Sequence, residues 1–191
     1  MLAALRILVL VAGPTASAQV FSFGLKTGIP MNSLLESAAP SFQVVTHRYT
    51  LGPTVELKLF RVLALEADLL YKRLEYADVI TATAGASVKI DRWELPAVVK
   101  YVFDGRHVRS FVEVGGSFNR VVHIEGMNVV EVRHRHTRGL VIGAGLGRRI
   151  GFVRIEPEIR FTHWADRNFG VHDAPLRSKL TQAELLVGFM F

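Results

Sequence analysis

The most constraining feature of this sequence is a two-residue alternation of apolar and polar side chains that recurs from residue 20 to the C-terminus. Between Val153 and Phe161, every odd position is apolar and every even position is charged. A period of two predicts a β-strand whose two faces meet different surroundings. Eight segments share the pattern: residues 21–29, 49–59, 63–72, 93–103, 111–119, 139–147, 153–161 and 182–191. The sequence therefore predicts an all-β chain of eight strands.

The connections between these segments alternate in length. Short connections lie at residues 60–62, 104–107 and 148–151, and Asp104-Gly105 is a favourable hairpin turn. Long connections cover residues 30–47, 75–89, 121–137 and 163–180. Short turns at one end and long loops at the other are typical of an antiparallel up-and-down transmembrane β-barrel.

The composition agrees with membrane strands better than with membrane helices. Half of the 191 residues are hydrophobic and the mean hydropathy is +0.28, yet 21% of the residues are charged. A spanning helix needs about 20 consecutive apolar residues, and no run after the N-terminus approaches that length. The apolar excess must therefore lie on one face of the strands. The chain also has no cysteine, so its stability must come from backbone pairing and burial.

The N-terminus has the pattern of a secretory signal peptide. Arg6 precedes a short apolar stretch, residues 7–12, and Ala16-Ser17-Ala18 provides small residues before Gln19. We expect residues 1–18 to be a signal peptide that is cleaved between Ala18 and Gln19, and residues 19–191 to form the barrel domain. Export makes nucleic acid an unsuitable partner for the net charge of +6, whereas anionic envelope lipid suits it.

The polar face is predicted to line the inside of the barrel. Eight strands enclose an interior just wide enough for side chains to fill, so inward charges must neutralise one another. The apolar face carries aromatic residues near strand ends, as an interfacial girdle requires: Tyr49, Tyr71, Trp93, Tyr101, Phe103 and Phe161. The predicted lumen charge network consists of Glu56, Glu66, Asp68, Lys72, Glu94, Lys100, Glu113, Glu156, Glu158 and Arg160.

Several stretches within residues 20–191 resemble one bacterial family. They are RYTLGPTVEL, LEADLLYKR, WELPAVVKY, FVEVGGSF, EPEIRFTHW and the terminal LLVGFMF. They are similar to the bacterial outer-membrane β-barrel domain family, small eight-stranded barrels of the OmpA/OmpX type. The resemblance implies the outer membrane, short periplasmic turns, long outer loops, and a C-terminal aromatic residue, here Phe191, that the barrel-assembly machinery reads.

One predicted loop is rich in histidine and arginine. His134 and His136 alternate with arginines, and His123 lies across from them if the hairpin turns near Met127-Asn128. Three imidazoles can bind Zn²⁺ or Cu²⁺, although a basic surface loop explains the same residues, so no metal site is assigned. The arginines Arg133, Arg135 and Arg138 are candidates for contact with lipopolysaccharide phosphates or other anions, and simple solvated loop charge is the alternative.

The sequence contains only weak candidates for a catalytic or nucleotide-binding site. Glu156 and Glu158 lie two residues apart, and His163 and Asp166 lie at a loop edge, but neither pair has the further groups that catalysis requires. Glycines 143, 145 and 147 lack the strand-to-helix context of a nucleotide loop. We therefore expect no catalytic residues and no cofactor.

The function expected from these features is a non-enzymatic role in envelope structure, adhesion or surface interaction. The alternatives are a small porin or transport channel, a lipid-modifying outer-membrane enzyme, and a soluble ligand-binding barrel. The expected partners are outer-membrane lipid, lipopolysaccharide and, during biogenesis, the barrel-assembly machinery. We expect a monomer and no nucleic acid.

Overall fold

The computed structural model describes residues 20–32, 35–37, 48–77, 87–105, 108–125, 134–166 and 176–191. The predicted signal peptide, residues 1–18, lies outside these ranges. The described part of the chain contains no helix that is long and apolar enough to cross a membrane.

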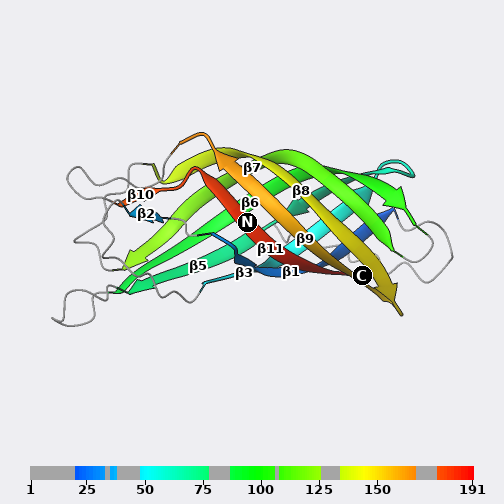
Figure 1. Ribbon diagram of the computed structural model, residues 1–191. Coiled ribbons are helices and arrows are strands. Elements are labelled where there is room, and N and C mark those ends of the chain that lie inside the picture. The colour runs from blue at the N-terminus through cyan, green and yellow to red at the C-terminus, as the bar shows by residue number, and fades with distance from the viewer. Residues whose placement is uncertain are drawn as a thin grey trace, which may run out of the picture.

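The described residues form a closed antiparallel barrel (Figure 1). Strand β1 closes it by pairing with β3 on one side and with β11, the last strand, on the other. The remaining neighbours follow chain order, so every strand has a partner on both sides and no sheet edge is left open. The barrel strands are β1 (Phe21–Pro30), β3 (Arg48–Lys58), β4 (Leu63–Asp68), β5 (Leu70–Ala77), β6 (Ser87–Asp104), β7 (Arg109–Glu125), β8 (His136–Ile150), β9 (Val153–Trp164) and β11 (Thr181–Met190).

Strands β4 and β5 are one barrel strand interrupted at Leu69. Both pair with β3 in a single register, since Thr54 faces Asp68 and Leu51 faces Tyr71. The interruption lies beside Pro53 of β3, which accepts a hydrogen bond from Leu69 but has no N–H to return one. Counting β4 and β5 together, the barrel has eight strands, which confirms the predicted fold class.

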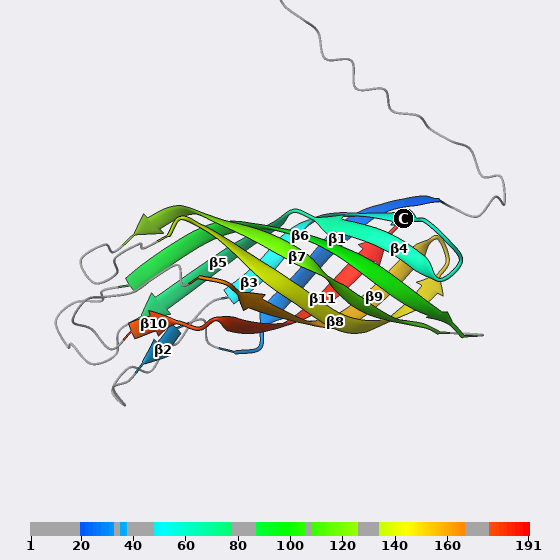
Figure 2. The same ribbon diagram turned by 90° about the horizontal axis from the view of Figure 1, so that it is seen from above.

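Two predicted loops contain strand that the sequence pattern did not indicate. Strand β2 (Leu35–Ser37) pairs with β10 (Leu176–Ser178) in a small separate sheet, although both segments were predicted as loop. This sheet lies beyond one end of the barrel, away from the C-terminus, in both views (Figures 1 and 2). A segment of three residues is too short to show an alternation, so this small sheet depends on pairing between segments that are distant in the sequence.

Strands β5, β6 and β7 extend into the predicted loops 75–89 and 121–137. Strand β6 begins at Ser87 and β7 continues to Glu125. At the base of this extension opposite charges face each other, since Arg73 Nε lies 3.9 Å from an oxygen of Asp91, and the backbone register continues as far as Lys89 opposite Glu125. Such cross-strand pairs favour continued pairing where the apolar alternation has stopped.

The opposite end of the barrel has the short turns. Strands β8 and β9 are joined by Gly151 and Phe152 alone, and Gly151 has a φ of 63°, a left-handed conformation that tight hairpins require and glycine adopts without strain. The predicted turn at 104–107 is described only as far as Gly105, because residues 106 and 107 lie outside the described ranges.

Burial alternates along most of the barrel-strand residues whose burial the structure describes. In β1, Ser22, Gly24 and Lys26 are buried while Phe21, Phe23 and Leu25 are exposed. The same inversion holds in β9, whose charged residues are inside and whose Ile159 and Phe161 are outside. A water-soluble barrel shows the reverse arrangement, since its apolar side chains fill the core.

Candidate functional site

The lumen is filled by charged side chains. All ten residues of the predicted lumen network are buried, and none has more than 4% of its surface exposed. Further charged side chains are buried beside them: Lys26, Arg92 and Glu184. Among the described residues, eight carboxylates and five cations are buried, and the half-buried Arg109 and Arg154 add two more cations near the turns.

Arg160 of β9 is the centre of this network. Its guanidinium is 2.7 Å from Asp68, 2.8 Å from Glu113 and 2.9 Å from Glu158, and it also reaches Glu66 at 3.3 Å. These carboxylates come from β4, β7 and β9, so one side chain connects strands across the interior. Planar guanidinium groups suit such multiple contacts because they present five N–H donors in a fixed geometry.

Two lysines complete the central cluster. Lys26 Nζ lies 2.6 Å from Glu66 and 3.0 Å from Glu158. Lys100 Nζ pairs with the other oxygen of Glu66, lies 3.2 Å from Glu156, and stands 4.2 Å from the centre of the Phe111 ring. Glu66, which is fully buried, therefore receives both lysines as well as Arg160.

A second cluster lies nearer the loop end. Lys72 Nζ is 2.7 Å from Glu94 and also pairs with Glu184, and the Ser117 hydroxyl donates to Glu94 at 3.1 Å. Arg92 donates to the side-chain oxygen of Gln182 at 2.7 Å. Arg92 was absent from the predicted network, although extending the alternation two residues back from Glu94 would have found it.

Glycines on the inner face make room for these long side chains. A Cβ at Gly143 would lie 2.6 Å from Glu113 Oε1, and one at Gly145 would lie 2.4 Å from the ring of Phe111. The spacing of Gly143, Gly145 and Gly147 therefore reflects a crowded lumen rather than a phosphate-binding loop.

Carboxylates gather closely enough in the lumen to be considered as metal ligands. In the described part of the chain, the groups with this spacing are Glu56 with Glu66 and Glu156, and Glu66 with Glu113 and Glu158. Lys100 and Arg160 already occupy the space between these carboxylates, at the distances given above. The donor set therefore suits internal cations better than a metal ion.

The outer surface carries two groups of aromatic residues. Tyr49, Tyr71 and Trp93 form a row across β3, β5 and β6, with ring centres 6.3 and 5.3 Å apart. The turn end carries the pair Tyr101–Phe103 and a cluster in which Phe191 lies 6.0 Å from Phe23 and 6.3 Å from Phe152.

The distance between the two groups can be read along β6. Trp93 and Phe103 are ten residues apart, which at about 3.3 Å per residue and a tilt of about 40° is a height of about 25 Å. The outward residues between them, Leu95, Val99 and Tyr101, are apolar or aromatic and exposed. This height equals that of the apolar band of an outer-membrane-type barrel.

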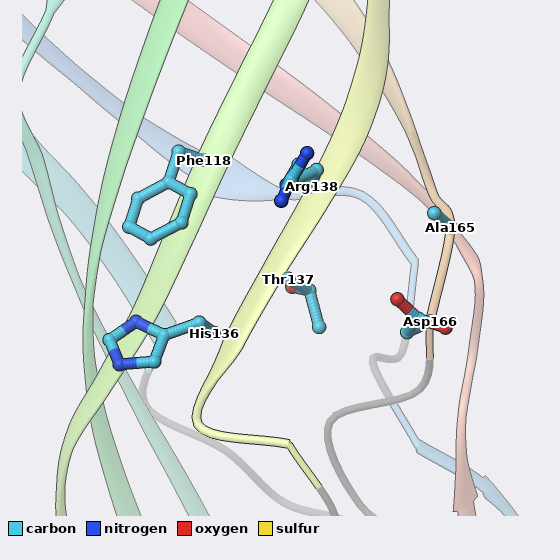
Figure 3. Close-up of a pocket in the computed structure, with 6 residues that line it drawn as sticks. All are labelled: Phe118, His136, Thr137, Arg138, Ala165 and Asp166. Carbon is cyan, nitrogen blue, oxygen red and sulfur yellow. The ribbon is translucent and has the colours of Figure 1, made fainter.

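A pocket of about 350 Å³ opens at the loop end of the β7–β8 face (Figure 3). The His136 ring stacks on Phe118 at a centroid distance of 5.6 Å. Arg138 lies between this aromatic pair and Asp166 in the close-up (Figure 3). Thr137 and Ala165 complete the lining. We call this pocket the rim pocket.

Within the described residues, the histidines and arginines that the sequence offered as metal or anion ligands do not gather at one site. His123, His134 and His136 are all exposed, and β7 places Arg120 rather than His123 opposite His136. Arg135 and Arg138 are exposed, and Arg133 lies outside the described residues. Of these six residues, the rim pocket contains His136 and Arg138.

The weak catalytic candidates are also placed. Glu156 and Glu158 belong to the lumen network and contact Lys100 and Arg160. The His163 ring nitrogen Nδ1 lies 2.9 Å from the Thr181 hydroxyl on the outer surface, and Asp166 lines the rim pocket.

Comparison with known proteins supports this fold. The outer membrane protein OprG of Pseudomonas aeruginosa superposes with a TM-score of 0.58 at 8% identity, covering 89% of this chain and 92% of OprG. Neisserial surface protein A gives a TM-score of 0.54 at 14% identity, covering 89% and 94% of the two chains. No family profile and no curated sequence matches the chain. The likeness is one of fold: an eight-stranded antiparallel barrel of the OmpA/OmpX type.

Proposed function

We propose that the chain is an integral outer-membrane β-barrel with a non-enzymatic role in envelope structure, adhesion or surface interaction. The observation that carries this proposal is the inversion of the two faces, with ion-paired charges inside and exposed aliphatic and aromatic side chains outside. Apolar side chains are stable in contact with the hydrocarbon core of a bilayer. A closed barrel also leaves no strand edge whose backbone N–H and C=O groups would be exposed to hydrocarbon. In this proposal the chain is exported by residues 1–18 and acts as a monomer.

Heat-modifiable gel mobility tests the architecture in the membrane. Protein extracted from membranes in detergent should migrate at different positions before and after boiling, because a folded barrel stays compact in the unheated sample. Residue-specific proteolysis of intact cells, cleaving within the predicted loops but not the turns, would support the outer location. Equal mobility of the boiled and unheated samples would contradict the proposal.

A transport pore is the second candidate, and the packed lumen disfavours it. Open aqueous channels occur in barrels with more strands, whereas eight strands leave space that side chains fill. Arg160, Lys26 and Lys100 cross that space here. We expect no sustained conductance steps when the purified barrel is inserted into planar bilayers. Regular steps of one size would favour the pore instead.

Non-enzymatic character is also a proposal. Glu158 is occupied by buried cations, and the His163 ring contacts the Thr181 hydroxyl on the outer surface. We expect no turnover of purified envelope lipids, whether the protein carries His163 or His163→Ala. Turnover that depends on His163 would support a lipid-modifying enzyme.

Phe191 is proposed as the residue that the barrel-assembly machinery reads. It is exposed at the end of the closing strand, beside Phe23 and Phe152. Deleting it should lower the amount of inserted protein in cells several-fold, while the purified variant still refolds in detergent. Insertion at the level of the unaltered chain would contradict this assignment.

A further inference from the structure

We propose that the rim pocket binds the phosphorylated sugar headgroup of an outer-leaflet glycolipid. This inference rests on the proposed outer-membrane location and specifies which membrane component the outer surface recognises. It is carried by four properties of the pocket that occur together: a cation, an aromatic stack, a carboxylate and an adjoining apolar surface.

The cation is Arg138. Its side chain is exposed at the outer end of β8, and Arg120 of the neighbouring strand is exposed beside it, opposite His136 in the register. Arg138 and Asp166 line the same pocket but do not form an ion pair. The guanidinium can therefore engage a phosphate through two parallel hydrogen bonds, the geometry in which arginine binds such groups best.

The aromatic stack and the carboxylate suit a sugar ring. The rings of Phe118 and His136 lie nearly parallel, with an interplanar angle of 21°, and present an aromatic surface to the pocket. Asp166 lies on the other side of Arg138 (Figure 3) and offers oxygens that accept hydrogen bonds from hydroxyl groups. A carboxylate would repel a bare phosphate, so its presence favours a ligand that carries hydroxyl groups as well as the anion.

The apolar surface begins directly beneath the pocket. Leu140, which is 70% exposed, follows Arg138 by two residues on the same outward face, and it pairs with Gly116 of β7. A Cβ built on Gly116 would meet no atom nearer than 3.8 Å, so the surface is open there. Ala97, the next outward neighbour across the sheet, is also small. An acyl chain attached to the bound sugar can pack against this flat area.

The position of the pocket matches that of a glycolipid headgroup. His136 of the pocket pairs in register with Arg120 of β7, and Arg120 pairs with Trp93 of β6, so the pocket continues the row of Tyr49, Tyr71 and Trp93 across the outer face. The headgroup level of the outer leaflet is therefore where the cation, the stack and the carboxylate are found, and the acyl region is where the surface becomes apolar.

The test is a binding measurement on the folded, detergent-solubilised chain by native mass spectrometry. The probes are bisphosphorylated lipid A, the same lipid without phosphates, phosphatidylglycerol and inorganic phosphate. We expect lipid A to bind most tightly. Arg138→Gln should weaken its binding about tenfold or more because a bidentate, charge-assisted contact is lost. Dephosphorylated lipid A should show a similar loss with the unaltered chain.

Matched variants separate this site from general basic charge. Arg148→Gln removes an exposed arginine near the turn end of the same strand and should change lipid A affinity less than about twofold. Phe118→Leu and Gly116→Leu, which alter the stack and the open area, should each weaken binding several-fold.

Three results would overturn the inference: equal effects of Arg138→Gln and Arg148→Gln, equal binding of dephosphorylated lipid A, or phosphatidylglycerol or inorganic phosphate binding as tightly as lipid A. Heat-modifiable mobility, measured on every sample, distinguishes failure of the glycolipid site from failure of the proposed membrane location. A chain that shows the mobility shift but no preference for lipid A contradicts only the glycolipid site. Absence of the shift in the unaltered chain contradicts the proposed membrane location.

Discussion

The inner and outer faces of β9 are built from alternate residues of a single strand, yet they follow opposite rules. Inside, Glu158 and Arg160 are nearly or fully buried and paired with charges from other strands. Outside, Ile159 and Phe161 are each more than 40% exposed. Inside, an isolated charge is costly and a precise partner is required, whereas the outside requires only apolar character. Substitutions should therefore be judged by the face on which they fall.

The largest expected effect is the loss of the central cation. Arg160→Leu removes the partner shared by Asp68, Glu113 and Glu158 and leaves buried carboxylates close together. Breaking a buried ion pair from one side costs about 3–5 kcal/mol in the free energy of unfolding. Urea titration of the barrel refolded in lipid vesicles measures the change. Arg148→Leu, an exposed arginine on the outer face, serves as the control and should cost less than about 1 kcal/mol. Equal stability of both variants would show that the lumen network is not structural.

A charge placed on the outer face tests the other side of the comparison. Val99 lies near the middle of the apolar band on β6, and Val99→Arg should cost about 2–4 kcal/mol in the same titration. Ile150→Arg, next to the turn at Gly151, should cost about 0–1 kcal/mol because depth in the bilayer sets the penalty. The absence of any difference between the two sites would indicate that this face meets water.

The smallest expected change in stability is that between alanine substitutions at two glycines, one on each face. Gly143→Ala places a methyl group 2.6 Å from Glu113 Oε1, and Arg160 holds that carboxylate in place, so about 1–3 kcal/mol should be lost through overpacking. Gly116→Ala places a methyl group in open space on the outer face and should change stability by less than about 0.5 kcal/mol. Equal costs in the urea titration would mean that the lumen can relax around the added atom.

Much of the architecture could be predicted from local pattern. Alternation identified each barrel strand and assigned its inward residues, so the ten predicted lumen charges, from Glu56 to Arg160, all lie inside. Prediction was incomplete where the pattern weakened. The extension of β6 to Ser87 and the pairing of β2 with β10 depend on partners brought together by the fold rather than on apolar alternation. The rim pocket could not be foreseen for the same reason, since its residues come from β7, β8 and the segment after β9.

The sequence by itself determined the face on which each strand residue lies, because a period of two links every side chain to one side of the sheet. It also indicated that the polar face would be the inner one, since that face mixes charges of both signs with glycines while the other face carries bulky aliphatic and aromatic residues. Only the tertiary structure decided which cation meets which carboxylate. Lys26 contacts Glu66 and Glu158, which are 40 and 132 residues away along the chain. Such contacts depend on strand register and barrel closure, and these are properties of the whole sheet rather than of any one segment.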